Sequence, residues 1–498
     1  MRRTGARFGG TVRPVLIAFR HGVASADPVP DGVLLWTRCT TDAAGPVAVD
    51  WWIGPSADEP LAGGTAEASP EADYTVHVDV GGLEPATTYW YGFSAGGVTS
   101  PVGRTRTAPA ADGSAAPLRL GLTSCAYWSC GFFTAYANLA ARDLDLVVQV
   151  GDYLYENDVM RGNRRAVRSH RPAGPLVTLA DYRIRHAQYK SDPDLQALHA
   201  SHPIAAAWDD HDLVGGTWRG GAAAHRPEHH GPWENRKAAA VQAYFEWIPM
   251  RRSGHDSVYR SLRLGPLADL VLLDTRVVGR ERPPATTERP ILRPDRTPRA
   301  LLGEAQWRWL EAEASASTAR WLLLGNQVMM APLRALNVAG GLGFNAGQWD
   351  GYPAERERLF ETLRRGGWAS DVAVLSGDIH SSWAADLPVG AEFVSPSVTT
   401  DSFARTVLPA VPGVSALARR VLLSQNRHLR LADVDHHGYV TVDVSADRIQ
   451  ADWWHVDSIA RRPAGERWAG GWSLGHGQLG LRRASAPVSG SVARQPAH

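Results

Sequence analysis

Residues that could bind metal ions or transfer protons follow six short apolar runs in the second part of this chain. In chain order these residues are Cys125, Asp152 with Tyr155, Asp209-Asp210-His211, Asp274-Thr275-Arg276, Asn326, and Asp378-Ile379-His380. Carboxylates, amides and imidazoles are common metal ligands, and a guanidinium fork binds oxyanions. One polar residue after a buried strand is ordinary, but six such ends predict a multi-metal site with an oxyanion clamp.

Asp152 lies at the centre of this pattern. Val147 to Val150 has the composition of a strand buried on both faces, and Gly151 permits a sharp turn. Asp152 and Tyr155 then follow the carboxyl end of the strand, where open α/β sheets bind their ligands. Taken alone, this motif is more typical of an acid that caps a helix. The other five strand ends favour a metal site, with Asp152 as the bridging carboxylate.

These residue types predict ester hydrolysis by a metal-activated hydroxide. Two metals about 3.5–4 Å apart can share a carboxylate and screen both the attacking and the leaving oxygen. Asp378 and His380 are separated by one residue and could face the same cation. Arg276 is expected to bind non-bridging phosphate oxygens. His211 is either a metal ligand or the general acid for the leaving group, and the sequence does not separate these roles.

The cysteine and the tyrosine narrow the choice of metal. A thiolate with a phenolate is unusual for magnesium or calcium but suits iron. For Cys125 the ordinary alternative is a packed cysteine, and a disulfide with Cys130 is also open. The chain has only three cysteines, so no disulfide framework is expected.

An α/β layered domain is expected from residue 118 onward, because strand-like runs alternate there with helical stretches. The strand-like runs cover 118–123, 146–150, 203–208, 270–273, 321–324 and 372–375. The helical stretches cover 181–200, 233–248, 303–316 and 354–365. If these strands form one parallel or mixed sheet, all six ends open on the same edge.

Residues 12–108 predict a separate N-terminal β-sandwich, because short alternating runs recur there between Gly, Pro and Asp turns. Leu83 to Tyr91 is similar to the turn and strand of fibronectin type III modules. Residues 109–117 are the expected linker. A catalytic domain over 118–460 and a C-terminal tail over 461–498 complete the expected organisation.

Composition excludes several functional classes. The 498 residues carry a net charge of +1, so no strong field recruits nucleic acid as a stable partner or an acidic membrane. No run approaches the ~18 apolar residues of a membrane span. Arg2-Arg3 is followed by an apolar stretch, Val15 to Phe19, that is too short for a signal peptide, so no export signal is expected. Nothing indicates the oligomeric state.

Other motifs carry less weight. Gly471-Trp472-Ser473-Leu474-Gly475 matches the nucleophile elbow of serine hydrolases, but its flanks do not predict the strand and helix that the elbow needs. His225, His229 and His230 are expected in a solvated loop. Gly340 to Gly347 is expected to be a surface loop near the site. Four late residues could complete the site but rank low: Asn426, His428, His436 and His437.

Most of the chain resembles the alkaline phosphatase D (PhoD-like) family, relatives of the calcineurin-like metallophosphoesterases. The resemblance rests on Gly22 to Pro28, Asp31 to Arg38, Gly151 to Glu156, Trp208 to Asp212, Leu273 to Arg276 and Ser376 to His380. It implies a fibronectin III-like N-terminal β-sandwich followed by a four-layer α/β/β/α metallophosphoesterase domain.

The resemblance also implies hydrolysis of phosphate monoesters, and often diesters, at alkaline pH. The expected cofactors are iron(III) (Fe3+), with Cys125, Asp152 and Tyr155 at the iron side, and calcium (Ca2+). Asp378 and His380 match the closing metal-binding motif. Members are usually exported folded by the twin-arginine route, which implies an extracytoplasmic location.

One departure motivates an alternative. Family members usually carry an asparagine shortly after the Asp-Asp-His block, where this chain has Gly215 and Gly216. One metal site is then weaker, filled by water, or served by Asn326 or Asp209. The alternative function is a non-catalytic phosphate-binding protein on the same fold. A serine hydrolase that uses Ser473 is a third, separate hypothesis.

Overall fold

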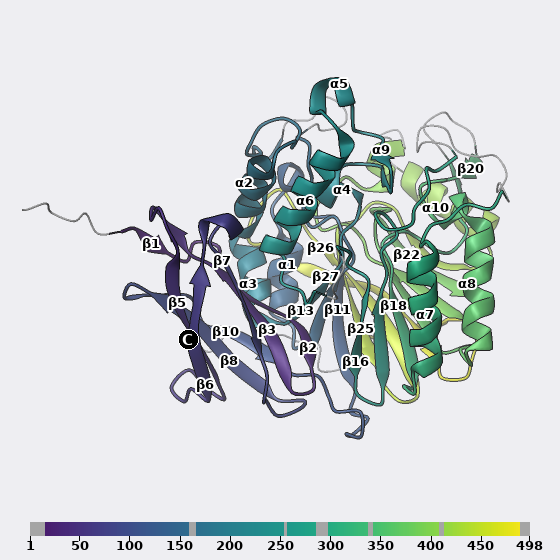
Figure 1. Cartoon of the computed structure of the whole chain (residues 1–498). Helices are drawn as coiled ribbons and strands as arrows, with labels where there is room; N and C mark the ends of the chain where they lie inside the picture. Colours follow the sequence, from purple (N-terminus) through teal and green to yellow (C-terminus); the bar gives the residue numbers. More distant parts are fainter. Residues whose placement is uncertain are drawn as a thin grey trace, which may run out of the picture.

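Two large β-sheets organise the chain, in a computed structural model that describes residues 15–158, 166–252, 256–284, 297–336, 342–407 and 413–488. The first sheet has ten strands (Figure 1). In spatial order they are β28 (Arg482–Ala484), β27 (Glu466–Gly475), β26 (Arg448–Val456), β25 (Gly438–Val444), β11 (Leu118–Thr123), β12 (Leu146–Gln149), β13 (Ile204–Ala206), β2 (Val23–Val29), β3 (Gly32–Arg38) and β7 (Thr75–Val80). Strands β11, β12 and β13 run parallel to one another.

The second sheet has seven strands, and its central members are also parallel neighbours. In spatial order they are β16 (Arg260–Leu264), β17 (Ala268–Leu272), β18 (Trp321–Gly325), β21 (Val372–Ser376), β23 (Gly390–Val394), β22 (Ser382–Leu387) and β24 (Leu429–Asp433). The six predicted strands are therefore present, but they divide between two sheets. They do not form the single sheet considered above, because a buried parallel strand has the same apolar composition in either sheet. Two sheets agree with the four-layer order that the family resemblance implies.

The two sheets pack face to face through a shared apolar core. Leu120 and Val148 of the first sheet are fully buried in one cluster with Leu323 and Phe393 of the second. Burial on both faces explains why these strands are nearly continuous apolar runs rather than alternating ones.

Helices cover the outer face of each sheet. Those of the first sheet are α1 (Thr134–Ala140), α2 (Leu179–Lys190), α3 (Pro193–Ser201) and α6 (Trp233–Trp247). Those of the second are α7 (Glu304–Ala316), α8 (Pro353–Arg365) and α10 (Val414–Gln425) (Figure 1). The expected four-layer α/β/β/α order is thus confirmed.

Shorter elements connect these layers. They are β1 (Ile17–Ala18), β4 (Thr40–Thr41), β14 (Thr217–Trp218), β15 (Gly221–Ala222), β19 (Arg334–Leu336), β20 (Leu342–Phe344), α4 (Asp210–Leu213), α5 (Pro227–His230) and α9 (Phe403–Val407). No helix in the described ranges is long and apolar enough to cross a membrane. Arg2, Arg3 and part of the 340–347 stretch lie outside the described residues.

The N-terminal strands form a sandwich that shares a sheet with the rest of the chain. Its outer sheet contains β5 (Val47–Gly54), β6 (Ala62–Ala68), β8 (Thr88–Ala95), β9 (Val98–Thr99) and β10 (Gly103–Arg106). This sheet packs on β2, β3 and β7 through residues such as Leu35, Ile53 and Tyr91. Strand β2 pairs with β13 at Ala26 and Ile204, so the module is continuous with the ten-stranded sheet rather than separate.

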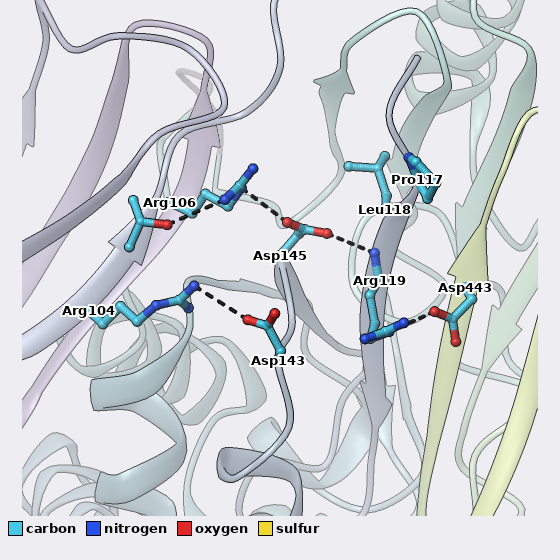
Figure 2. Close-up of a pocket in the computed structure, with 9 residues that line it drawn as sticks. Arg104, Arg106, Pro117, Leu118, Arg119, Asp143, Asp145 and Asp443 are labelled. Carbon is cyan, nitrogen blue, oxygen red and sulfur yellow. Dashed lines mark hydrogen bonds and ion pairs between the residues drawn. The ribbon is translucent and has the colours of Figure 1, made fainter. Parts of the chain in front are cut away.

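Ion pairs reinforce this junction. Arg104 and Arg106, from the sandwich, face Asp143 and Asp145 (Figure 2). These residues line a cavity of about 270 Å³. Arg106 and Asp145 are 3.1 Å apart, and Arg104 and Asp143 are 3.7 Å apart. These charges lie at the opposite end of β12 from Asp152, so they serve the junction and not the predicted site.

Two further expectations need correction. The predicted helix over 181–200 is two helices, because Asp192 caps a new helix at Pro193, whose missing N–H suits a first turn. The C-terminal segment is not a tail within the described residues, since β27 and β28 extend the first sheet.

All three cysteines are free and buried, so Cys125 and Cys130 are not bonded to each other.

Stability should fall in acid because of His186 on α2, which is fully buried with no hydrogen bond to either ring nitrogen. Burial lowers the pKa of His186 from 6.5 to about 3, with a further contribution from Lys190. Between these values the unfolded chain binds a proton that the folded chain does not, which costs about 1.4 kcal/mol per pH unit.

We therefore expect His186→Phe to lose less stability than the wild type between pH 6 and pH 4. The slope of the unfolding free energy against pH should decrease by about 1.4 kcal/mol per pH unit, which corresponds to one proton. Urea unfolding followed at several pH values measures that slope. An unchanged slope in a folded variant would contradict the assignment to His186.

Candidate metal centre

The carboxyl ends of strands from both sheets meet at one place. Ser124, after β11, forms a parallel bridge with Ser397, which follows β23. The N–H of Cys125 donates to the carbonyl of Gly151 (3.1 Å), which joins the loops after β11 and β12. Two sheets packed face to face therefore bring these strand ends together, a role that the sequence predicted for the edge of one sheet.

Three groups of potential ligands lie at this place, and they overlap. Within each group the ligand atoms are all within 4.8 Å of one another. The groups are Cys125 with Asp152 and His380, Asp152 with Asp210 and His211, and Asp209 with Asp210 and Asp378. Asp152 and Asp210 each belong to two groups, so carboxylates link the three groups into one cluster.

Tyr155 completes the first group. Its hydroxyl donates to Asp152 Oδ2 at 2.7 Å and lies 3.2 Å from His380 Nε2. The Thr400 hydroxyl donates to the same phenol oxygen at 2.9 Å. Thr400 was not predicted, because a threonine after a strand carries no sequence signal for such a contact.

The backbone at four of these candidate ligands is strained. Cys125, Asp152, Asp378 and His380 have φ values of 61°, 52°, 62° and 52°, in the left-handed region that residues with a side chain rarely adopt. Such strain costs on the order of 1–3 kcal/mol per residue and is concentrated at functional sites. Here it turns each loop sharply enough for these side chains to meet.

Gly151 allows the closest approach in the cluster. Its φ is 107°, and a Cβ at this position would lie 2.3 Å from the Cβ of Asp209. Only glycine therefore permits the loop after β12 to sit against the Asp209-Asp210 segment.

Arg276 is the main cation among the carboxylates. Its Nη2 donates to Asp209 Oδ2 (3.0 Å) and Asp378 Oδ1 (2.6 Å), and lies 3.2 Å from Asp210 Oδ1. Although burial alone would lower it, these three carboxylates hold the pKa of Arg276 well above its ordinary value. Arg276 thus lies in the cluster as predicted, but its contacts here are to carboxylates.

His211 is oriented by an acid that the predicted site did not include. Its Nδ1 lies 2.7 Å from Glu156 Oε2, which leaves Nε2 as the nitrogen available for chemistry. Burial alone would lower the pKa of His211, but Glu156, Asp210 and Asp152 together raise it well above 6.5. Glu156 ends the same loop as Asp152 and closes the Gly151 to Glu156 motif, and these were its only sequence signals.

Gly215 and Gly216 contribute through their backbone. The N–H of Gly215 donates to Glu156 Oε1 at 2.8 Å, and the N–H of Gly216 donates to Asp210. A Cβ at Gly215 would lie 2.8 Å from His211 Cε1. The segment that lacks the family's asparagine therefore supports His211 and Asp210 instead.

The hydrogen bonds of Asn326 are made to residues outside the cluster. Its side chain accepts a hydrogen bond from Trp349 Nε1 (3.0 Å) and donates to Ser376 Oγ (2.9 Å) and to the carbonyl of Val328. The amide therefore serves the core below the strand ends. Gln348, which was not predicted, donates to Asp378 from the loop that carries Trp349.

The late residues divide into near and far positions. His437 Nε2 lies 3.0 Å from the carbonyl of Thr400, next to the cluster. Asn426 binds the backbone of Arg334, and His428 lies 2.8 Å from the carbonyl of Pro332. Neither of these two joins the cluster through a contact.

Asp433, His436 and His455 form another group of closely spaced ligand atoms. The two imidazole rings are stacked, with centroids 4.7 Å apart and planes at 9°, so one cation cannot lie in both ring planes. Arg467 also donates to His436 Nε2 (2.7 Å), whereas a metal-bound histidine needs an acceptor there. The group instead braces the loop after His380, since His455 Nε2 lies 3.1 Å from Ser382 Oγ.

The remaining motifs do not form sites. Ser473 lies in the middle of β27, paired with β26 and β28, so it has no nucleophile elbow and the serine-hydrolase hypothesis is wrong. Within the described part of the chain, His225, His229 and His230 form no group of three ligands.

The donor set fits metal ions. Burial raises the pKa of Asp152 to about 7, and the pKa values of Asp209 and Cys125 well above their ordinary values. Asp210 is the exception, because Arg276 and His211 outweigh burial and lower its pKa. Four carboxylates and a thiol thus share one site with one guanidinium and two imidazoles, a charge balance that cations would complete.

Known proteins resemble this chain over most of its length. Residues 120–453 match the PhoD-like phosphatase family, and residues 11–109 match the N-terminal domain of PhoD-like phosphatases. The chain is 34% identical to alkaline phosphatase D of Bacillus subtilis (strain 168), over 95% of this chain and 84% of that protein.

A solved structure titled "Structure of PhoD" superimposes with a TM-score of 0.83 at 32% identity, over 95% of this chain and 94% of that one. These likenesses support metal-dependent hydrolysis of phosphate esters, and nothing among them supports a non-catalytic binding protein. The chain therefore belongs to the PhoD-like phosphatase family.

Proposed function

We propose that the overlapping ligand groups are the catalytic centre of this phosphoester hydrolase. The proposal rests on one observation, that Asp152 and Asp210 each belong to two groups of ligand atoms within 4.8 Å. Shared carboxylates are the usual way to hold two cations close together on one ester. The proposed ligands are Cys125, Asp152, Tyr155, Asp209, Asp210, Asp378 and His380.

The donor types support different metals in different groups. A thiolate and a phenolate beside Asp152 favour iron(III) at Cys125 and Tyr155. The carboxylates of Asp209, Asp210 and Asp378 favour a hard cation such as calcium. Asn326 was an expected ligand, but its hydrogen bonds argue against that role.

The cations, when bound, supply Lewis-acid polarisation of the ester and an activated water. Arg276 lies among the same carboxylates and would bind the non-bridging phosphate oxygens through its guanidinium fork. His211, held at Nδ1 by Glu156, would donate a proton from Nε2 to the leaving oxygen. His380 lies against the Tyr155 hydroxyl and would act as a ligand of the same group.

Substrate and location follow from the family resemblance. The substrate is a small-molecule or polymer phosphate ester, and an extracytoplasmic location is proposed. We also propose that residues 118–460 are the catalytic region, with residues 466–484 as part of its first sheet.

Removing Asp152 should remove both metal and activity. We expect Asp152→Asn to lose bound iron and to show no hydrolysis of 4-nitrophenyl phosphate, because both groups that share this carboxylate are broken. Chelation of the wild type should have the same effect, reversed by added metal. Asp58→Asn, an exposed acid of the sandwich, is the matched control. Full activity in a metal-free Asp152→Asn protein would contradict the proposed centre.

The role of His211 can be tested with two leaving groups. For His211→Gln we expect turnover of an alkyl phosphate to fall about 10²–10⁴-fold, as for loss of a general acid. Turnover of 4-nitrophenyl phosphate should fall far less, because its leaving group needs no proton. Equal losses on both esters together with loss of metal would instead show that His211 is a ligand.

A further inference from the structure

Five aromatic rings form a continuous stack that leads into the metal centre. In order they are Tyr189, His170, Tyr127, Tyr155 and His211. Successive ring centroids are 5.9, 5.4, 4.3 and 4.4 Å apart, and successive planes meet at 15°, 23°, 15° and 29°. The two shortest steps are those on either face of Tyr155.

The stack joins five separate segments of the chain. Tyr189 lies on α2, and its hydroxyl accepts from the N–H groups of Trp128 (3.0 Å) and Tyr155 (3.3 Å). The same hydroxyl lies 3.2 Å from His170 Nε2. Its hydrogen bonds therefore fix the backbones beside Tyr127 and at Tyr155 relative to each other.

Tyr127 packs flat against one face of the Tyr155 ring. The hydroxyl of Tyr127 donates to Asn157 Oδ1 at 2.9 Å, so its own ring is anchored at the edge. Tyr127, Cys130 and Tyr155 form one buried apolar cluster. With Tyr127 on one face and His211 on the other, the Tyr155 ring has little freedom to swing toward either neighbour.

The position of the Tyr155 oxygen depends on where that ring lies. The oxygen lies 2.7 Å from Asp152 Oδ2 and receives a hydrogen bond from Thr400. If the side chain swung about its Cα–Cβ bond, the oxygen would leave the group formed by Cys125, Asp152 and His380. His211, which stacks on the opposite face, would lose its support at the same time.

We propose that Tyr127 is a positioning residue that acts through Tyr155 on both metal binding and His211. This inference rests on the proposed function, in which Tyr155 is a metal ligand. Tyr127 would then act like the residues that contact and orient metal ligands in other proteins. Mutation of such residues typically weakens metal affinity about 10–100-fold.

A simple packing role makes a different prediction. Loss of a buried ring would lower the stability of the chain and leave the metal and the chemistry unchanged. Tyr244 on α6 is a buried aromatic residue outside the stack, so Tyr244→Leu is a matched control for that effect.

The test compares Tyr127→Leu, which removes the ring, with Tyr127→Phe, which keeps it. For Tyr127→Leu we expect iron affinity, measured by competition with a chelator, to fall about 10–100-fold. The visible absorption band of an iron-bound phenolate should shift or weaken. At saturating metal, kcat on an alkyl phosphate should fall more than kcat on 4-nitrophenyl phosphate. Tyr127→Phe should restore affinity and band.

Wild-type affinity and absorption in folded Tyr127→Leu would overturn the proposal. If that variant does not fold, His170→Leu removes the ring on the other face of Tyr127, and unchanged affinity and band there would overturn it equally. Tyr155→Phe distinguishes a failure of the proposed ligand set from a failure of the positioning role of Tyr127. If Tyr155→Phe binds iron normally, the proposed ligand set fails. If Tyr155→Phe loses iron while Tyr127→Leu keeps it, only the role of the stack fails.

Discussion

The structure depends on the concentration of negative charge at the point where two sheets meet. Four carboxylates and a thiol lie there, all buried except the partly exposed Asp378, and burial raises the pKa values of Cys125, Asp152 and Asp209. Such groups are tolerated in a protein interior only when cations or hydrogen-bond donors compensate them. Arg276 and His211 supply part of that compensation, and metal ions are suited to supply the rest.

The fold is built to impose this arrangement. The shared core between the sheets holds the strands rigidly, so the loops at their ends can carry strained residues such as Asp152 and Asp378. Glycines at 151 and 215 allow the loops to approach closely, because a Cβ at Gly151 would collide with Asp209 and a Cβ at Gly215 would collide with His211. The sandwich extends the first sheet through β2. It therefore supports the strands beside the centre and is not connected to them by a linker alone.

The sequence predicted the strands well, and the structure brings most of the predicted site residues together, because both follow from local patterns. Strand β11 has the bounds predicted for it, and most other predicted strands differ from theirs by one or two residues. The division into two sheets did not follow from the local patterns, because apolar runs do not encode their neighbours; only the family resemblance implied it. Glu156, Thr400 and Gln348 were missed since they act through contacts between distant loops. Asn326 was misplaced, because a polar residue at a strand end can equally serve the core.

The most direct test of the centre is to locate the metals themselves. Anomalous scattering from crystals of the as-purified protein, recorded on both sides of the iron edge, identifies iron and its neighbours. We expect an iron peak between Cys125, Asp152, Tyr155 and His380, with another cation near Asp209, Asp210 and Asp378. Iron bound elsewhere, or a fully active protein with no metal at these residues, would contradict the proposed centre.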